Sequence, residues 1–237
     1  IGGSDSVIVK VPLDEMRFDD GNVAYSFFEL PDIRVRLIQG MTTVMYGACH
    51  VDNNTQRVYR SVASGSSMDW VSRDIDAWSN GNSTAPGPDG VDWFSGTENS
   101  THTIRGATCT NDEVFFFWQS AQTGGYPFPY WCISRYSRND SRSYNGSNVV
   151  WSDLGGWAYA SGHVNDRSHM GGTATFGGGT YYPSSVAWIL DDYTGTDAFN
   201  IDSVFVYQGT DGPPVVRWGD YLTARRHTPY GNTWVGT

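Results

Sequence analysis

The chain has little leucine, glutamate and lysine, the residues that helices use most. Its 237 residues include 6 Leu, 4 Glu and a single Lys, against 21 Val, 21 Asp and 14 Arg. Valine and aromatic residues suit the pleated surface of a sheet, and aspartate suits turns. Together with 28 Gly, 10 Pro, 10 Trp, 14 Tyr and 11 Phe, this composition predicts an all-β protein with many turns.

Basic charge and long apolar runs are also missing. The formal net charge is -10 and the pI is near 4.7, which disfavours binding to nucleic acid or to an anionic membrane surface. No segment approaches the roughly 18 apolar residues of a spanning helix, so we expect no membrane span. The start, Ile1-Gly2-Gly3-Ser4, lacks the pattern of a leader and suggests a processed or incomplete end. The length suits a single domain over residues 1–237.

Cysteine is scarce and odd in number, with Cys49, Cys109 and Cys132. Three cysteines permit one disulfide with one thiol left over, which is not the pattern of a disulfide-stapled scaffold. If residues 104–109, 113–120 and 130–136 form a meander, Cys109 lies opposite Glu113 and at the far end from Cys132. A bridge between them is therefore disfavoured, and we expect at least two of the three to be buried apolar side chains.

Strand and turn signals alternate along the chain as in antiparallel meanders. Alternation over residues 33–38 predicts a half-buried strand with Arg34 and Arg36 on one face. Two hairpins are predicted over residues 43–62 and 103–120.

The two hairpins resemble each other. Tyr46-Gly47-Ala48-Cys49 matches residues 105–109 at an offset of 59 to 60, and a weaker third copy begins near residue 185. Such repeats predict a β-propeller of antiparallel four-stranded blades, four or five blades at about 45 to 60 residues each. The alternative is a β-sandwich in which the similarity of the hairpins is accidental.

Two segments near the end resemble a known family. They are the Gly-rich tract 171–183, which ends in Tyr182-Pro183, and the run Arg217-Trp218-Gly219-Asp220-Tyr221 with the basic pair Arg225-Arg226 and the Trp strand at 234. In the same order, these are similar to the last part of a class of secreted, mostly bacterial β-propeller proteins. The resemblance covers about residues 155–237. It implies a propeller fold and secretion but no chemistry, because that family has no agreed activity.

Aromatic residues supply the first set of candidate binding residues. Two prolines stiffen the loop that holds Tyr126, Tyr130 and Trp131, which lowers the ordering cost of binding. With Trp157, these rings can stack on a sugar or anchor a protein partner. Trp78, Trp93 and Tyr144 are further exposed candidates. The alternative is that the rings fill gaps between blades.

A basic cluster supplies the second set. Arg225 and Arg226, beside His227, can grip a carboxylate or sulfate, because the guanidinium group is a bidentate fork; a solvated or Asp-paired strand face is the alternative. Asp220 can lie at the mouth of a ring and bind calcium or orient a substrate, or it can cap a turn.

Metal and cofactor signals are weak. The five histidines show no spacing typical of zinc. An oxygen-rich loop containing Asp191, Asp192 and Asp197 is a calcium candidate, although Asp-rich turns are common. No other cofactor is expected.

The sequence favours a secreted, non-catalytic binding or structural module that recognises a glycan or an extracellular protein. The alternative is a carbohydrate-active enzyme, such as a sialidase-like or other propeller glycoside hydrolase. Hydrolysis of this kind usually needs two positioned carboxylates, whereas the abundant Asp residues sit mostly in turn contexts. Low lysine content, acidic charge and five glycosylation sequons in predicted loops favour secretion. The sequons are at Asn53, Asn82, Asn99, Asn139 and Asn145.

Overall fold

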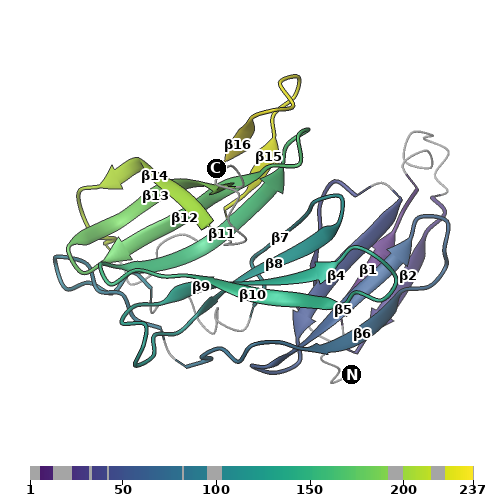
Figure 1. Cartoon of the computed structure of the whole chain (residues 1–237), viewed down its shortest axis with the longest axis horizontal. Helices are drawn as coiled ribbons and strands as arrows, with labels where there is room; N and C mark the ends of the chain where they lie inside the picture. The colour runs from purple at the N-terminus through teal and green to yellow at the C-terminus, as the bar shows by residue number, and fades with distance from the viewer. Residues whose placement is uncertain are drawn as a thin grey trace.

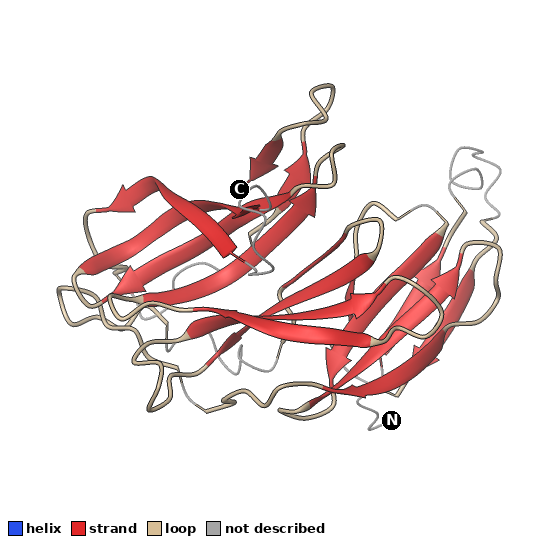
Figure 2. Ribbon diagram, viewed as in Figure 1, coloured by secondary structure: helices blue, strands red, loops and turns tan. Residues whose placement is uncertain are grey.

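Every regular element of the computed structural model is a strand within the residues that it describes, which are 6–12, 23–31, 34–41, 43–81, 83–94, 103–191, 200–214 and 222–236. Figure 2 shows the strands, joined by loops and turns. The strands form three four-stranded and two two-stranded antiparallel sheets. The all-β prediction is confirmed. No helix in these ranges is long and apolar enough to cross a membrane.

The three four-stranded sheets are meanders, because each strand pairs with the next along the chain. We call them blades 1, 2 and 3 (Figure 1). Blade 1 contains β3 (Arg36–Leu37), β4 (Val44–His50), β5 (Thr55–Val62) and β6 (Asp69–Asp74); blade 2 contains β7 (Gly106–Cys109), β8 (Glu113–Ser120), β9 (Tyr130–Ser137) and β10 (Tyr144–Val150); blade 3 contains β11 (Gly156–Val164), β12 (Met170–Gly178), β13 (Tyr181–Asp191) and β14 (Asn200–Gly209).

Two short hairpin sheets flank the blades. The first pairs β1 (Ser6–Lys10) with β2 (Ser26–Leu30), and its inner face packs on blade 1. The second pairs β15 (Ala224–Arg226) with β16 (Trp234–Gly236), next to blade 3. The chain therefore places its sheets one after another in sequence order (Figure 1).

Blade 2 has a hydrophobic core on both of its faces. Along β8, Phe116 and Trp118 pack toward blade 1, while the alternating Phe115 and Phe117 pack toward blade 3. A two-layer sandwich has one buried face per sheet, and its strands alternate apolar and polar residues. A sheet stacked between two others needs apolar side chains on both faces, which the run Val114 to Trp118 supplies. Propeller blades share this arrangement of sheets stacked in series.

The first strands of successive blades meet. Strand β7 contacts both β3 and β11, and β15 contacts β11. The approach of β7 to β11 depends on Gly106, because a Cβ at this position would lie 2.5 Å from the backbone oxygen of Ala160. The inner edges of the sheets are thereby brought to one common region, in which the candidate site lies.

The repeat predicted from the sequence is out of frame by one strand. The predicted hairpins are present as β4–β5 and β7–β8. However, β4 is the second strand of blade 1, whereas β7 is the first strand of blade 2. The reason is that β3 pairs over only Arg36–Leu37, so the first strong hairpin signal of blade 1 comes one strand late.

All three cysteines are free thiols. Cys49 and Cys132 are buried and Cys109 is partly buried, which confirms the prediction that at least two act as apolar side chains. Cys109 pairs with Val114, one residue beyond the predicted Glu113. Burial raises the pKa of the Cys132 thiol well above its ordinary value, so this thiol stays protonated and unreactive.

Candidate functional site

The predicted aromatic surface is largely interior. Tyr130 and Trp131 are 4% and 0% exposed, and the ring of Trp131 stacks on that of Trp157 at 5.6 Å between centroids. Only Tyr126 in this group is partly exposed. The expectation that these rings present an open stacking surface is wrong, because Trp131 and Trp157 fill the core between blades 2 and 3 and Tyr130 belongs to the core between blades 1 and 2.

The other predicted aromatic candidates are also buried or partly buried. Trp78 and Trp93 are 4% and 0% exposed, and Tyr144 is partly buried. These residues lie outside strands or at strand ends, which wrongly indicated exposure. In this fold, rings from connecting segments cover the ends of the cores between the sheets.

The predicted basic pair is divided between two faces of β15. Arg226 forms an ion pair with Asp166, whereas Arg225 lines a cavity that contains no part of Arg226. Adjacent residues of a strand point to opposite faces, so this division follows from the strand geometry. His227 stacks on the ring of Tyr230 at 5.4 Å.

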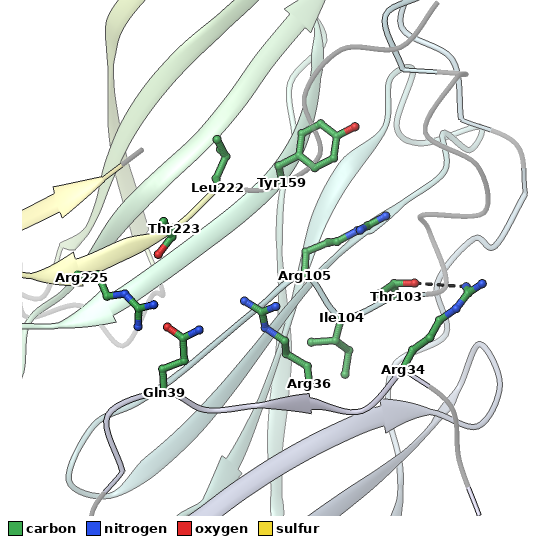
Figure 3. A pocket seen from close by; sticks show the side chains of 10 residues that line it. All are labelled: Arg34, Arg36, Gln39, Thr103, Ile104, Arg105, Tyr159, Leu222, Thr223 and Arg225. Atoms are coloured by element: carbon green, nitrogen blue, oxygen red, sulfur yellow. Dashed lines mark hydrogen bonds between the residues drawn. The ribbon is translucent and has the colours of Figure 1, made fainter. Parts of the chain in front are cut away.

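The cavity lies where the first strands of the three blades and β15 meet (Figure 3). Its volume is about 550 Å³, within the range of small-molecule sites. Four arginines line it, namely Arg34, Arg36, Arg105 and Arg225. Arg36 comes from β3 of blade 1 and Arg34 from the segment just before it. Arg105 comes from the segment before β7 of blade 2, and Arg225 comes from β15.

The walls of the cavity are mixed. Gln39 and Thr223 contribute an amide and a hydroxyl, and Ile104, Leu222 and Tyr159 contribute apolar surface. Figure 3 shows Gln39 between Arg36 and Arg225 in this view, with all three side chains directed toward the same part of the cavity. Such a lining suits a ligand with both charged and apolar parts.

Positive charge is concentrated in this cavity. The pKa of Arg36 is lowered by burial and, after that, by the nearby charges of Arg105 and Arg225. No Asp or Glu is among the described residues that line the cavity. Within the described ranges, neither Arg36 nor Arg225 has a hydrogen-bond or ion-pair partner. Guanidinium groups remain charged in proteins, so Arg36 is repelled by both Arg105 and Arg225.

Four arginines outside this cavity, Arg60, Arg135, Arg142 and Arg226, pair with carboxylates. Arg142 meets Asp69 at 2.6 Å and Arg60 meets Asp140 at 2.7 Å. A second cavity, of about 350 Å³, also borders Gln39, but its Arg226 is paired with Asp166. Among the residues that the structure describes, Arg36 and Arg225 of the arginine-lined cavity have no such carboxylate partner.

Two strained backbone residues support the assignment of this cavity as the candidate functional site. Arg34 and Tyr159 adopt φ values of 60° and 55°, in the left-handed region that bulky residues rarely occupy. Tyr159 lies at a β-bulge in β11, between Ala158 and Ser161, and its amide donates to Oε1 of Gln119 at 3.2 Å. Bulges and strained residues re-aim side chains at functional sites.

Arg34 reaches the cavity from the segment before β3. Its Nη1 donates to Oγ1 of Thr103 at 3.4 Å, drawn as a dashed line in Figure 3. The sequence placed Arg34 and Arg36 on one face, which the cavity lining supports, but it assigned them no role. Arg105 was not singled out at all.

The predicted calcium loop and Asp220 fall on residues outside the described ranges, apart from the backbone of Asp191. Asp192, Asp197 and Asp220 lie outside the described residues, and of Asp191 only the backbone, at the end of β13, is described. The run Arg217 to Tyr221 lies outside as well. In the described ranges, no group of three or more His, Cys, Asp or Glu side chains could hold a metal ion.

The sequons differ in their surroundings. Asn139 is exposed in a loop, with its Oδ1 accepting from the amide of Arg142 at 3.1 Å. Nδ2 of Asn53 donates to the oxygen of Trp78, so a sugar attached there would leave a single N–H for this bond. Asn145 is not in a loop as predicted, but at the bulge of β10. Asn82 and Asn99 lie outside the described residues.

Comparisons with protein-family models, with curated proteins and with solved structures found no match to this chain. The resemblance to secreted propeller proteins therefore stays a prediction from residues 171–183 and 217–234.

Proposed function

We propose that the protein is a secreted, non-catalytic binding module that holds an acidic glycan in the arginine-lined cavity. The observation that carries this proposal is that Arg36 and Arg225 lie together at the meeting point of the sheets, with no carboxylate partner among the described residues. A bound carboxylate or sulfate would accept bidentate hydrogen bonds from these groups and relieve their repulsion.

The size and lining of the cavity favour a sugar over an extended protein surface. A volume of about 550 Å³ matches a mono- or disaccharide-sized ligand. Gln39 and Thr223 can bond sugar hydroxyls, and Leu222 and the ring of Tyr159 can contact the apolar face of a pyranose. An acidic segment of a protein partner is the other outcome that the experiment below can reveal.

Secretion is part of the proposal. It is supported by the single lysine, the net charge of -10 and the sequons, of which Asn139 lies in an exposed loop. Intact mass of the protein expressed in a glycosylating host tests whether Asn139 carries a sugar, with Asn139→Gln as the comparison.

The carbohydrate-active enzyme remains the alternative. It would need a carboxylate pair at the bound sugar, and the cavity lining within the described ranges supplies none. Turnover of an aryl glycoside that is abolished by Asp→Asn at one carboxylate would establish the enzyme and refute the non-catalytic module.

Two neighbouring arginines provide a matched test. Arg225→Met removes a charge from the cavity, and Arg226→Met removes the same charge from the opposite face of β15. We expect isothermal titration with galacturonate to show binding to the natural protein. Arg225→Met should lose about tenfold or more in affinity, because charge-assisted bonds are lost, and Arg226→Met should bind as before.

Galactose is the neutral control, since it has the same ring without the carboxylate. Binding of galacturonate should weaken as salt concentration rises, because the interaction is between charges. Equal binding of galactose and galacturonate, or equal losses in Arg225→Met and Arg226→Met, would refute the proposal. Failure of both sugars to bind alongside capture of an acidic peptide would assign the cavity to a protein partner.

A further inference from the structure

The cavity carries more positive charge than one acidic group requires. Arg36 and Arg225 are close enough to influence each other electrostatically, and together they can bind one carboxylate. Arg34 lines the same cavity but is held by Thr103. Figure 3 shows Arg34 and Thr103 on one side of Ile104 in this view, and Arg36 on the other.

This arrangement gives two subsites that can each bind an anionic group. We define the inner subsite as Arg36, Arg225 and Gln39, and the outer subsite as Arg34 with Thr103. Ile104 is 2% exposed and comes from the segment just before β7. The two subsites therefore share one cavity but stand on different parts of its wall.

The outer subsite is built and not accidental. Arg34 is exposed and has no carboxylate partner in the described part of the chain. Its backbone nevertheless adopts the left-handed conformation at φ 60°, which costs energy for a residue with a Cβ. Its Nη1 bond to Thr103 fixes the side chain against the leading segment of blade 2, which leaves the other donors of the guanidinium group for a ligand.

We infer that the ligand is an acidic oligosaccharide with charged groups on at least two sugars. Arg36 and Arg225 would bind the first acidic group and Arg34 the second, with the sugar rings between. This inference rests on the proposed function, since it specifies the ligand of the same cavity. Carboxylates and sulfate esters share the chemistry that the guanidinium fork recognises.

The experiment compares two disaccharides of equal size. A galacturonate disaccharide has two carboxylates, and a galacturonate–galactose disaccharide has one. The inference predicts that the natural protein binds the doubly charged sugar about tenfold more tightly in isothermal titration. Arg34→Met should abolish this difference and leave the affinity for the singly charged sugar within about twofold. Arg225→Met should weaken both.

Two further arms complete the design. A doubly sulfated neutral disaccharide distinguishes sulfate from carboxylate as the natural acidic group. Thermal unfolding of Arg34→Met checks that the variant is folded, which we expect because the side chain is exposed.

The outcomes separate the two proposals. If both disaccharides bind the natural protein equally and Arg225→Met weakens both, the two-subsite inference is wrong and the proposed function stands. If a difference exists but Arg34→Met preserves it, the outer subsite is misassigned. If neither the uronates nor the sulfated sugar binds, both the inference and the acidic-glycan function fail.

Discussion

Replacement of Gln56 by leucine should destabilise the contact between blades 1 and 2. Gln56 is on β5 of blade 1 and is fully buried. Its Oε1 accepts hydrogen bonds from Oγ of Ser134 at 2.7 Å and from the hydroxyl of Tyr136 at 2.6 Å, both on β9 of blade 2. One amide oxygen thus satisfies two buried hydroxyls across a sheet-to-sheet interface.

The magnitude follows from the number of groups left without a partner. Leucine has a similar volume but no acceptor, so both hydroxyls would lose their bond in a core that excludes water. Each buried donor without a partner costs about 1–3 kcal/mol, which gives a total of about 2–6 kcal/mol for the two hydroxyls. Against a typical stability of about 5–15 kcal/mol, this is a large fraction.

A double-mutant cycle isolates the interaction. Tyr136→Phe removes one donor and keeps the acceptor, so its own cost should be near 1 kcal/mol. In the double variant, leucine at position 56 leaves only Ser134 without a bond. The double variant should therefore be more stable than the sum of the single effects predicts, by about 1–3 kcal/mol. Guanidinium unfolding followed by tryptophan fluorescence measures each free energy.

Two results would refute this reasoning. A loss below about 1 kcal/mol in Gln56→Leu would mean that the hydroxyls find other acceptors. Strict additivity of the two substitutions would mean that Gln56 and Tyr136 do not act through a shared bond.

Three further predictions concern other contacts. Lys10→Met should lower stability by about 1–2 kcal/mol in thermal unfolding, because the ammonium group donates to three backbone carbonyls in and after β5; unchanged stability would refute it. Gly106→Ala should cost more than about 2 kcal/mol, because its Cβ would meet the backbone of β11 at 2.5 Å, whereas Gly124→Ala, with no atom within 4 Å, should change stability by less than about 0.5 kcal/mol. Burial raises the pKa of Tyr136 above its ordinary value of about 10, so the native state keeps a proton that the unfolded chain loses. Its contribution to stability is complete below about pH 10 and falls at higher pH, and Tyr136→Phe should make that fall, measured by urea unfolding, shallower.

The strands could be predicted because their signals are local. The predicted strand from Glu113 to Ser120 coincides with β8, since a turn at residues 111–112 precedes a long apolar and aromatic run. Strand β3 shows the limit of such signals. Alternation predicted a strand over residues 33–38, but among its described residues the strand covers Arg36–Leu37, because Arg34 has a left-handed backbone that ends regular pleating.

The burial of the aromatic residues could not be predicted locally. Trp131 and Trp157 each come directly after a connecting segment, near the start of β9 and β11. Rings that bind ligands at a surface often have such positions. Their burial depends on blades 2 and 3 packing face to face, which no window of sequence contains.

The cavity has the same difficulty. Arg36, Arg105 and Arg225 are far apart in the chain and converge only because the inner strands of three sheets and β15 meet. Arg225 was predicted as an anion-binding residue from its basic neighbour, yet that neighbour faces away and pairs with Asp166. The sequence indicated that arginine could bind an anion, whereas only the fold shows which arginines lie together.

Unpaired charge at the centre of a fold opposes folding, and this cost is the strongest physical reason to assign the cavity a function. A protein with 25 acidic residues and 15 basic ones has ample carboxylates to pair each arginine, and it does so at Arg142, Arg60 and Arg226. Arg36 and Arg225 lack such a partner in the described part of the chain, although a third guanidinium group lies close by. A requirement other than stability accounts for this arrangement. An anionic ligand meets that requirement, because it supplies the missing negative charge when it binds, and its binding should then stabilise the fold through linkage.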